Sequence, residues 1–550
     1  MAPYKVGSVD VKSRDACKTS IPQLDHKTVE LPAGHRKQPN CRPLDTDTVF
    51  QQDQPLTLRD GTKIFADIFR PKSEAKVPAI MMWGPYVFLV MKTLKEWISR
   101  GYAIVNVDAR GVNNSEGDIR FWGTSEAQDG HDAIEELAKL PWCSGKIAMA
   151  GNSWLGICQY GIAGQQPPHL ACIAPLEGLS DALREDVFRG GIPNTAFGNW
   201  ITSVLPGRNQ VEDLVAMASE TPHVSDYFAD KRFDMTKIQV PAYIGASYST
   251  AVHTIGSLRA FEEIPHNNKW LALHASQEWY DLYSPQRNND LAKFFDFYLK
   301  NVPNDWPQTA PVRLALLRCT GPALVDQEFT DLPWHLPSAT SRKLYLASSG
   351  KLTTEKETEN RKLTFQADLS EEVAFTYQFP SKTVFVGPST LVIDVASTDH
   401  DDMDIYTHIF KADSNGKILS HVNMPKPDDT SAEEFEKMTQ NRVWRYEGPN
   451  GKLRVSRRHV SPELSGKTWK TLSHAKEEKV KPGEVVGLEI QLWPTGIVFE
   501  AGEKLILKIS GTEVGLPDLP NIPPPRNENK GKQVLHFGGS SEARLQFFTL

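Results

Sequence analysis

Several features that mark specialised classes of protein are missing from the sequence. No run of about 18 apolar residues, the length of a membrane-spanning helix, occurs in the chain of 550 residues. The N-terminal stretch MAPYKVGSVDVKSRD lacks the apolar core of a secretion signal. Basic side chains are not in excess, because 61 Lys and Arg stand against 68 Asp and Glu, for a formal net charge of −7. We therefore expect a soluble, cytoplasmic protein that binds neither nucleic acid nor membranes.

Cysteine is also scarce, with six residues in the whole chain. None belongs to a C-x-x-C pair, and none has a histidine nearby at the spacing of a zinc site. The pattern indicates neither a disulfide framework nor a metal site, and we expect no metal and no other cofactor. The cysteines are interpreted as free thiols in the core: Cys17, Cys41, Cys143, Cys158, Cys172 and Cys319.

What the sequence does contain is the composition of an ordinary globular protein. Hydrophobic residues make up 40% and charged residues 23% of the chain, and its 13 Trp argue against disorder. One core supports at most about 250 to 300 residues, so two or three domains are expected. Residues 1–45 are polar and without periodicity, which predicts an N-terminal extension.

Residues 46–310 alternate between apolar runs and segments with helical spacing, which predicts an α/β core with a parallel sheet covered on both faces. Helical fragments rich in Gly, Pro and Asn interrupt this rhythm at 180–236, and we interpret them as an inserted helical cap. Two short strands around an Asp-Gly turn are predicted in 56–71, and further strands span 76–84, 102–111, 146–153, 169–178, 240–249 and 269–275. The predicted helices span 90–101, 125–140, 154–164, 254–264 and 288–301.

From residue 311 to residue 550 the pattern changes to short β-rich runs, with turn residues at intervals of about 8 to 12 positions. The first of these runs is PVRLALLRC, residues 311–319. We predict that this C-terminal part is a jelly-roll β-sandwich.

One turn in the α/β region has the composition of a nucleophile elbow. In KIAMAGNSWLGICQYG (146–161), Ser153 separates a predicted strand from a predicted helix, and Gly151 supplies the small residue that such a strained turn needs. The second glycine is Gly156, one position later than the general motif, where Leu155 stands instead. A serine here would lie at the top of the sheet, and the Trp154 amide at the start of the helix would face a developing oxyanion.

The loop after the predicted strand 76–84 reads WGPYVF and is the other candidate source of oxyanion donors. The hydroxyl of Tyr86 could donate as well as a backbone amide. Three aromatic residues, Trp83, Phe88 and Trp279, are candidates to line an apolar substrate pocket, although each could equally belong to the core.

Longer stretches resemble the cocaine esterase and X-Pro dipeptidyl-peptidase (CocE/NonD) group of α/β-hydrolases. The resemblance spans about residues 48–515 and lies in GPY (84–86), RGYAIVNVDARGVNNSEG (100–117), LPWCSGKIAMAGNSWLG (140–156), STDHDDMDIY (397–406) and GKLRVSRRHV (451–460). It implies an α/β-hydrolase core, a helical cap and a jelly roll. It also implies that Ser153 forms an acyl-enzyme with esters or amides, with Tyr86 and the Trp154 amide as the oxyanion hole.

The sequence departs from this group where the base and the acid of a catalytic triad are expected. The group has its acid just after the strand matched by 240–249, but here Ser247-Tyr248-Ser249-Thr250 offers no carboxylate. Its histidine follows the next strand, and Glu278 takes that place in HASQEW (274–279).

Two histidines could replace the missing base. His274 ends the last strand of the core and is preferred, because this fold presents its histidine there; His253, at the start of the preceding helix, is the second candidate. For the acid that orients the base, Glu177, Glu278 and Asp281 remain unranked.

Three functions remain open. The leading hypothesis is a serine hydrolase that cleaves an ester or other activated acyl group of a small, largely apolar molecule. The alternative is a non-hydrolytic catalyst of a natural-product pathway, such as a cyclase, isomerase, lyase or acyl transferase, because the usual acid and base positions are not kept. A catalytically inactive binding protein is the third. A small molecule is the expected partner, and a homodimer is left open.

Overall fold

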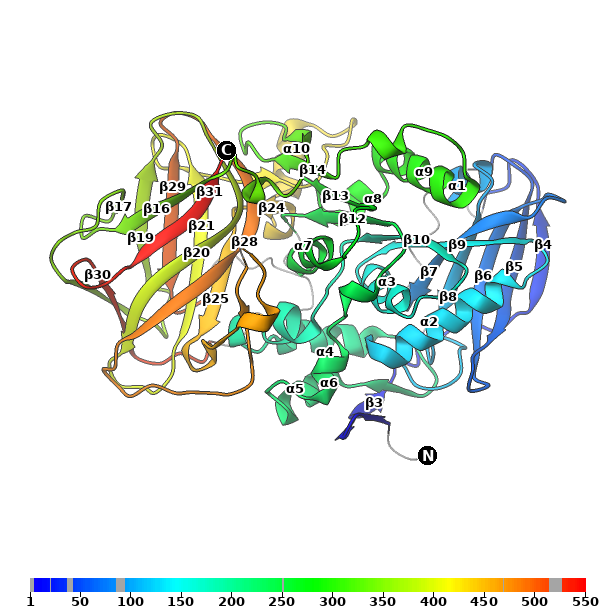
Figure 1. Ribbon diagram of the computed structural model, residues 1–550, viewed down its shortest axis with the longest axis horizontal. Coiled ribbons are helices and arrows are strands. Elements are labelled where there is room, and N and C mark those ends of the chain that lie inside the picture. Colours follow the sequence, from blue (N-terminus) through cyan, green and yellow to red (C-terminus); the bar gives the residue numbers. More distant parts are fainter. Residues whose placement is uncertain are drawn as a thin grey trace.

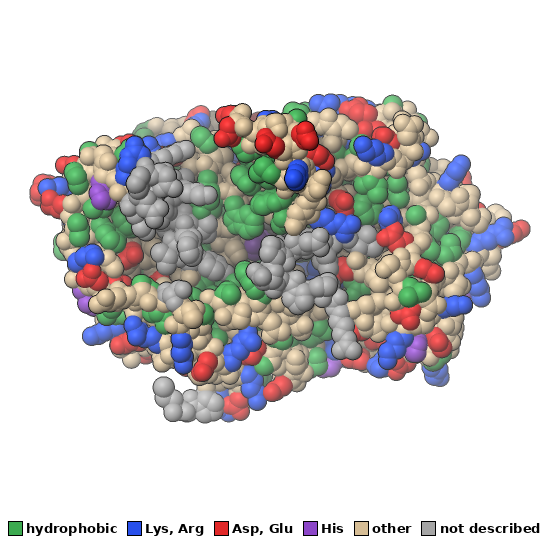
Figure 2. Space-filling view, turned by 180° about the vertical axis from the view of Figure 1, so that it is seen from behind, with side chains coloured by type: hydrophobic (Ala, Val, Ile, Leu, Met, Phe, Trp, Pro, Cys, Tyr) green, Lys and Arg blue, Asp and Glu red, His purple; other side chains and the backbone are tan. Residues whose placement is uncertain are grey.

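The computed structural model of the protein describes residues 4–19, 21–36, 43–85, 94–249, 252–467, 469–513 and 527–550. An α/β part and an all-β part lie side by side along the long axis of the molecule (Figure 1). Within the described ranges, no helix has both the length and the apolar character needed to cross a membrane. Acidic and basic side chains are interspersed over the face shown in Figure 2, in keeping with the modest net charge.

The α/β part is built on a sheet in which eleven of the described strands take part. Its central strands run parallel and are covered on both faces, as their uninterrupted apolar sequences predict, whereas the pairs at both ends are antiparallel. The order across the sheet is β15 (Leu324–Phe329), β14 (Val312–Leu316), β13 (Lys269–His274), β12 (Ala242–Ser247), β10 (Leu170–Leu176), β9 (Cys143–Asn152), β7 (Val77–Gly84), β8 (Ala103–Asp108), β6 (Lys63–Pro71), β5 (Thr48–Thr57) and β4 (Lys27–Leu31).

Two expected boundaries are corrected by this sheet. Strand β4 lies within the segment 1–45 that was expected to be an extension, yet it pairs with β5 at one edge. Strands β14 and β15 lie beyond residue 310, yet β14 continues the core sheet beside β13 instead of joining the β-sandwich. A local sequence pattern can indicate a strand, but the sheet edge with which that strand pairs is a long-range choice.

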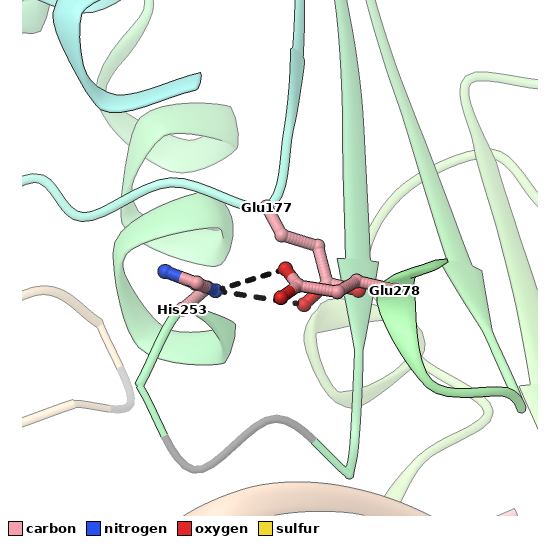
Figure 3. A group of neighbouring side chains, drawn as sticks. All are labelled: Glu177, His253 and Glu278. Carbon is pink, nitrogen blue, oxygen red and sulfur yellow. Dashed lines mark ion pairs between the residues drawn. The ribbon is translucent and has the colours of Figure 1, made fainter. Parts of the chain in front are cut away.

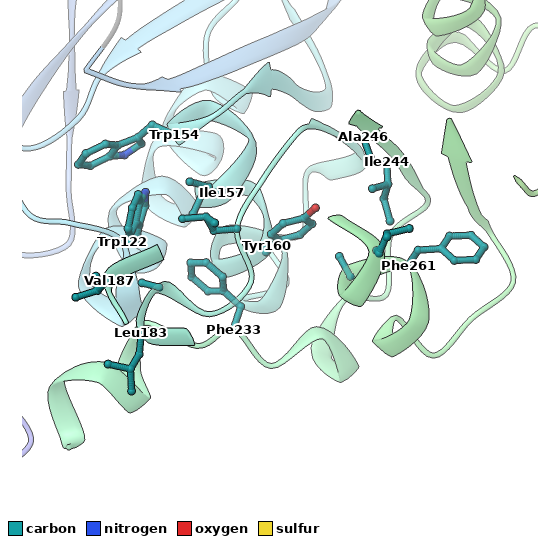
Figure 4. Close-up of a cluster of buried hydrophobic side chains, with 14 of the residues drawn as sticks. Trp122, Trp154, Ile157, Tyr160, Leu183, Val187, Phe233, Ile244, Ala246 and Phe261 are labelled. Atoms are coloured by element: carbon teal, nitrogen blue, oxygen red, sulfur yellow. The ribbon is translucent and has the colours of Figure 1, made fainter. Parts of the chain in front are cut away.

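Helices cover both faces of the sheet. On one face α2 (Gly123–Ala138), α3 (Trp154–Gly164) and α7 (Thr254–Glu263) pack into the larger apolar core, and on the other α1 (Leu94–Ser99) and α9 (Pro285–Lys300) pack into a second one. The short α8 (Glu278–Leu282) precedes α9. Figure 4 shows Trp154, Ile157 and Tyr160 of α3 in the same cluster of buried hydrophobic side chains as Leu183 and Val187 from the segment that follows β10.

That following segment forms the cap. It contains a π-helical turn η1 (Leu183–Val187), a 3-10 turn η2 (Arg189–Gly191), α4 (Thr195–Val204), β11 (Gln210–Glu212), α5 (Leu214–Glu220), α6 (Asp226–Asp230) and a 3-10 turn η3 (Met235–Lys237). The N-terminal strands lie beside it, because β3 (Ser13–Asp15) pairs with β11, while β1 (Lys5–Val6) and β2 (Val9–Asp10) form a small hairpin. The N-terminal segment is therefore part of the folded structure.

The C-terminal part is a sandwich of two antiparallel sheets. Among the described residues, the first sheet contains β16 (Thr340–Leu346), β17 (Leu352–Thr353), β18 (Arg361–Gln366), β20 (Thr383–Ser397), β28 (Val486–Phe499), β30 (Lys532–Phe537) and β31 (Arg544–Thr549). The second contains β19 (Glu372–Gln378), β21 (Asp404–Ala412), β22 (Ile418–Leu419), β25 (Asn450–Arg454) and β29 (Lys504–Ser510). Shorter elements connect them: β23 (His421–Val422), α10 (Ala432–Met438), β24 (Arg445–Tyr446), β26 (Val460–Ser461) and β27 (Thr471–Leu472).

Candidate active site

Ser153 occupies a strained turn between β9 and α3. Its backbone has φ 55° and ψ −126°, a conformation that L-residues rarely adopt and that commonly marks a functional position. Gly151 and Gly156 make the turn possible. A Cβ on Gly151 would lie 2.5 Å from the Leu155 Cβ, and a Cβ on Gly156 would lie 3.0 Å from the carbonyl oxygen of Glu177. The displaced second glycine is thus explained by the close approach of the chain at Glu177.

The start of α3 offers a donor for an oxyanion. The amide of Trp154 has no hydrogen-bond acceptor among the described residues, whereas the Ser153 amide donates to the carbonyl oxygen of Glu177 at 2.8 Å. The Trp154 indole is fixed by a hydrogen bond, because its Nε1 donates to Glu126 Oε1 at 2.8 Å. A fixed indole keeps the first turn of the helix, and with it the free amide, in one place.

Of the aromatic residues expected to line the substrate pocket, Trp83 lies in the core and Trp279 lines the cavity. Trp83 is fully buried in the core and donates its Nε1 to the same Glu126 oxygen at 2.9 Å, so it does not line the cavity beside Ser153. This corrects the expectation for Trp83, whose place in β7 directs its ring into the apolar layer under the sheet. Trp279 does line the cavity and is 40% exposed. Tyr86 and Phe88 lie outside the described residues.

Ser153 opens into a cavity of about 670 Å³. The cavity walls come from the α/β core, from α4 of the cap and from the C-terminal sandwich, and most of them are apolar. The aromatic residues that form them include Phe121, Trp122, Phe197, Trp200, Tyr446 and Trp493. A larger groove of about 880 Å³ lies between α7 and the sandwich, but Ser153 is not among its lining residues.

His253 lines the same cavity as Ser153. It is 7% exposed, and its Nδ1 lies 3.4 Å from Glu278 Oε2 and 3.8 Å from Glu177 Oε2 (Figure 3). The other ring nitrogen points away from both carboxylates, and Nε2 has no hydrogen-bond partner within the part of the chain that the structure describes. The imidazole is therefore oriented on one side and free to exchange a proton on the other.

His274 lies on the far side of Glu177. Its Nε2 is 2.9 Å from Glu177 Oε1, its Nδ1 is 3.1 Å from the Ser276 carbonyl oxygen, and it lines a separate cavity of about 330 Å³. Both ring nitrogens are thus engaged, and neither faces the cavity of Ser153. Of the two candidate bases, His253 lines the cavity of Ser153 and His274 lines the separate one.

The charges of this cluster act strongly on one another. Burial raises the pKa of a carboxyl group, but the hydrogen bonds from His253 and His274 outweigh it and hold the pKa of Glu177 well below its usual range. Burial alone would lower the pKa of His253, but the carboxylates of Glu177 and Glu278 raise it to about 10. His253 is consequently protonated at neutral pH in the resting site.

The same atoms could also hold a cation. The ligand atoms of Glu177, His253 and Glu278 all lie within 4.8 Å of one another in a buried position. Two carboxylates and one imidazole suit a divalent transition metal, but the 3.4 Å ion-pair distance between Glu278 Oε2 and His253 Nδ1 also suits an acid that orients a base.

Asp186 is among the polar residues of the cavity that the sequence analysis did not single out. Asp186, from the π-helical turn η1, is buried and lines the cavity, and it accepts a hydrogen bond from Asn194 Nδ2 at 3.1 Å. Burial raises its pKa to about 6. The run LREDV has no feature that separates this carboxyl from its neighbours, so only the fold singles it out.

Comparison with known proteins places the chain in a family. Residues 60–209 match the family model of the X-Pro dipeptidyl-peptidase (S15 family), and residues 304–546 match that of the X-Pro dipeptidyl-peptidase C-terminal non-catalytic domain. Cocaine esterase of Rhodococcus sp. (strain MB1 Bresler) is 32% identical over 136 residues, which are 24% of this chain and 24% of that protein. The curated relatives that it matches are each aligned over less than a third of their own length, from 24% to 31%.

Solved structures match over nearly the whole chain. A CocE/NonD family hydrolase from Staphylococcus aureus superposes with a TM-score of 0.83 and 26% identity, covering 97% of this chain and 99% of that one. An α-amino acid ester hydrolase superposes with a TM-score of 0.69 and 16% identity over 92% of this chain and 96% of that one, a likeness in fold alone. With both family models matched in order and the full architecture shared, the chain belongs to the CocE/NonD and X-Pro dipeptidyl-peptidase group of the α/β-hydrolase fold.

Proposed function

We propose that the protein cleaves an ester or another activated acyl group through an acyl-enzyme on Ser153, with His253 as the base. One observation carries the proposal: a serine in a strained turn and an imidazole with a free nitrogen line the same cavity. A serine hydroxyl becomes a nucleophile only when a neighbouring base takes its proton, and a second group must orient that base.

The proposed reaction uses each group for one task. Ser153 Oγ attacks the acyl carbonyl while His253 Nε2 accepts the hydroxyl proton, and the Trp154 amide donates to the developing oxyanion. The imidazolium is stabilised through Nδ1 by Glu278, with Glu177 as the second carboxylate. The leaving group then takes the proton from Nε2, and water repeats the sequence in reverse to release the acid.

In this arrangement the acid and the base have exchanged places relative to the pattern that the sequence resembles. His253 follows β12, where that pattern has its acid, and Glu278 follows β13, where it has its histidine. The two strands are parallel neighbours, with Ser247 opposite His274, so both loops open at the same end of the sheet. An acid and a base on these two loops can therefore stay in contact when the histidine and the carboxylate exchange loops.

The cavity favours a bulky and largely apolar substrate. Its aromatic walls and its volume of about 670 Å³ suit a drug-sized molecule, since ligand sites commonly span about 300 to 1,000 Å³. The few polar groups near Ser153, such as Asp186 and Glu278, would set the orientation of such a molecule.

The charge of His253 favours a second candidate function. With a pKa of about 10, the imidazolium form dominates at neutral pH, and it can donate a hydrogen bond to an enolate or alkoxide instead of accepting a proton. A cyclase, isomerase, lyase or acyl transferase would use the same cavity in this way.

The test combines covalent labelling with turnover. The protein is treated with a fluorophosphonate, and hydrolysis of p-nitrophenyl butyrate is followed in the wild type, Ser153→Ala, His253→Asn and the matched control His536→Asn on β30. We expect labelling at Ser153, loss of turnover in Ser153→Ala, and a fall in kcat/KM of about 10²- to 10⁴-fold in His253→Asn. The control should behave as the wild type.

Labelling without turnover would favour the non-hydrolytic function. Absence of labelling at any pH, or equal rates in His253→Asn and His536→Asn, would contradict the proposed hydrolase.

A further inference from the structure

Asn152 lies directly beside the proposed nucleophile. It is the last residue of β9, its side chain is 2% exposed, and it lines the same cavity as Ser153. Consecutive Cα atoms of a chain are about 3.8 Å apart. A ligand group that is bound by the Asn152 amide would therefore lie within a few bonds of the carbon that Ser153 attacks.

The side-chain amide of Asn152 is not used by the protein itself. Its Oδ1 is completely buried and has no hydrogen-bond partner, and Nδ2 forms no hydrogen bond with any part of the chain that the structure describes. Buried amides are nearly always paired, because an unpaired one loses its hydration without compensation. An exception inside a cavity and next to a nucleophile indicates a ligand that supplies the missing partner.

Gln277 is another buried amide of this cavity, with 6% of its surface exposed. Its Oε1 accepts the Glu278 amide at 3.0 Å, and its Nε2 has no acceptor within the described ranges. The carboxylates of the cavity differ from these amides because they have partners: Glu278 Oε2 faces His253 Nδ1 at 3.4 Å, and Asp186 accepts a hydrogen bond from Asn194. The polar groups that remain for a ligand near Ser153 are therefore neutral amides.

The surroundings of Asn152 determine which ligand group would suit it. Phe121, Trp122 and Trp154 make this part of the wall apolar, so a charged group would lose its hydration there without an opposite charge to replace it. The nearby carboxylates of Asp186 and Glu278 also disfavour an anion. A hydroxyl is neutral and both donates and accepts, so it can pair with either end of the amide.

We propose that Asn152 is a specificity-determining residue that hydrogen-bonds a hydroxyl of the substrate, within a few bonds of the reacting carbonyl. The inference rests on the proposed function, because it takes Ser153 as the nucleophile. The preferred substrates are then bulky, mostly apolar esters that carry a hydroxyl close to the acyl carbon. An analogue with a methyl group in place of the hydroxyl leaves the buried amide unpaired and is disfavoured.

The first experiment measures binding without turnover, in Ser153→Ala. Equilibrium dialysis gives the Kd of 1-(2-naphthyl)ethanol and of 2-isopropylnaphthalene, which differ by a hydroxyl in place of a methyl group. We expect the alcohol to bind more tightly, and Asn152→Leu in the same background to reduce this preference about tenfold.

The matched control is Asn288→Leu. Asn288 is also buried and its Nδ2 also has no hydrogen-bond partner among the residues described, but it does not line the cavity of Ser153. This variant should keep the preference for the alcohol.

The second experiment measures turnover with an intact Ser153. The kcat/KM for p-nitrophenyl 3-hydroxybutyrate is divided by that for p-nitrophenyl 3-methylbutyrate, whose acyl group has a methyl in place of the hydroxyl. Structural damage at the turn would slow both esters alike and leave this ratio unchanged. We expect the ratio to fall about tenfold in Asn152→Leu and in Asn152→Ala, and to stay constant in Asn288→Leu.

The outcomes separate this inference from the proposed function. Ratios that are the same with and without the Asn152 amide in both experiments would overturn the role of Asn152, even if the protein hydrolyses both esters. A preference for the alcohol that is lost in Asn152→Leu, in a protein whose Ser153 is never labelled by a fluorophosphonate, would support the binding role and refute the hydrolase. If Asn152→Leu does not fold, Asn152→Ala decides the question with the same two ratios.

Discussion

At the scale of single residues, His253 has two carboxylates near one ring nitrogen and an open cavity at the other. Burial disfavours its charged form, yet Glu177 and Glu278 outweigh burial and raise its pKa to about 10. A base of this kind is well oriented but is available only after it has lost its proton. The carboxylates that hold the ring in place thus also limit the pH range in which it works.

The pH dependence of the reaction should follow His253. We expect kcat/KM for p-nitrophenyl butyrate, after subtraction of spontaneous hydrolysis, to rise with pH and to reach half its maximum near pH 10, since only neutral His253 accepts the serine proton. In Glu278→Gln one of the two carboxylates that raise the pKa is lost, so the midpoint should fall by about one unit. The plateau should also fall, by about 10- to 100-fold, because the ring is less firmly oriented.

Glu135→Gln on α2 is the control for this prediction, because it removes a carboxylate that pairs with His169 instead of a residue of the site. A midpoint that stays in place or rises in Glu278→Gln would contradict the contact between Glu278 and His253.

At the scale of elements, the site is assembled from loops that follow neighbouring parallel strands. Ser153 follows β9, Glu177 follows β10, His253 follows β12 and Glu278 follows β13. The strands themselves could be predicted from sequence, because uninterrupted apolar runs between helical segments are a local signal. Helix α3 spans Trp154–Gly164, as its sequence predicts. The tight crossing of the chain at Gly156 and Glu177 could not be predicted, since it joins two elements.

Gly156 should therefore be intolerant of any side chain. In Gly156→Ala the new Cβ would lie 3.0 Å from the Glu177 carbonyl oxygen and 3.1 Å from that of Gly151, both of them backbone atoms that cannot move aside freely. We expect the free energy of unfolding to fall by about 1 to 3 kcal/mol, with a loss of fluorophosphonate labelling.

The matched control is Gly164→Ala at the other end of α3, where the nearest atom to a new Cβ is 3.9 Å away. Urea denaturation of both variants checks the prediction. Equal stability and equal labelling of the two would show that the crossing is not as close as described.

At the scale of the whole molecule, the cavity is closed by the C-terminal sandwich. Trp493 of β28 forms part of its wall and is 6% exposed. The guanidinium of Arg189, from the cap, lies 4.0 Å from the Trp493 ring, and Arg189 Nη2 donates to the Asn450 carbonyl oxygen at 2.8 Å. The position of this wall therefore depends on a contact between the cap and the sandwich.

Trp493 should decide how well bulky substrates bind. We expect Trp493→Ala to lower kcat/KM for the p-nitrophenyl ester of naphthoic acid at least about tenfold more than for p-nitrophenyl acetate, because only the larger acyl group reaches the lost wall. Trp469→Ala, in the groove that does not contain Ser153, is the control. A uniform loss for both esters would place Trp493 in a structural role.

Local sequence determined the parts of this protein that depend on neighbouring residues. The strands and helices of the core follow from the periodicity of their own apolar residues, and the turn at Ser153 follows from the small residues and the strand-to-helix change within a few positions. Family resemblance extended this to the order of the domains.

Only the tertiary structure decided which side chains meet. It placed Trp83 in the core, joined β4 and β14 to the central sheet, and put His253 in the cavity that Ser153 lines while His274 pairs with Glu177. The physical reason is that the direction of each ring is set by loops after β12 and β13, which come together only when the parallel strands align. Charged side chains that are far apart in the sequence then pair with one another, and no local sequence pattern indicates these pairs.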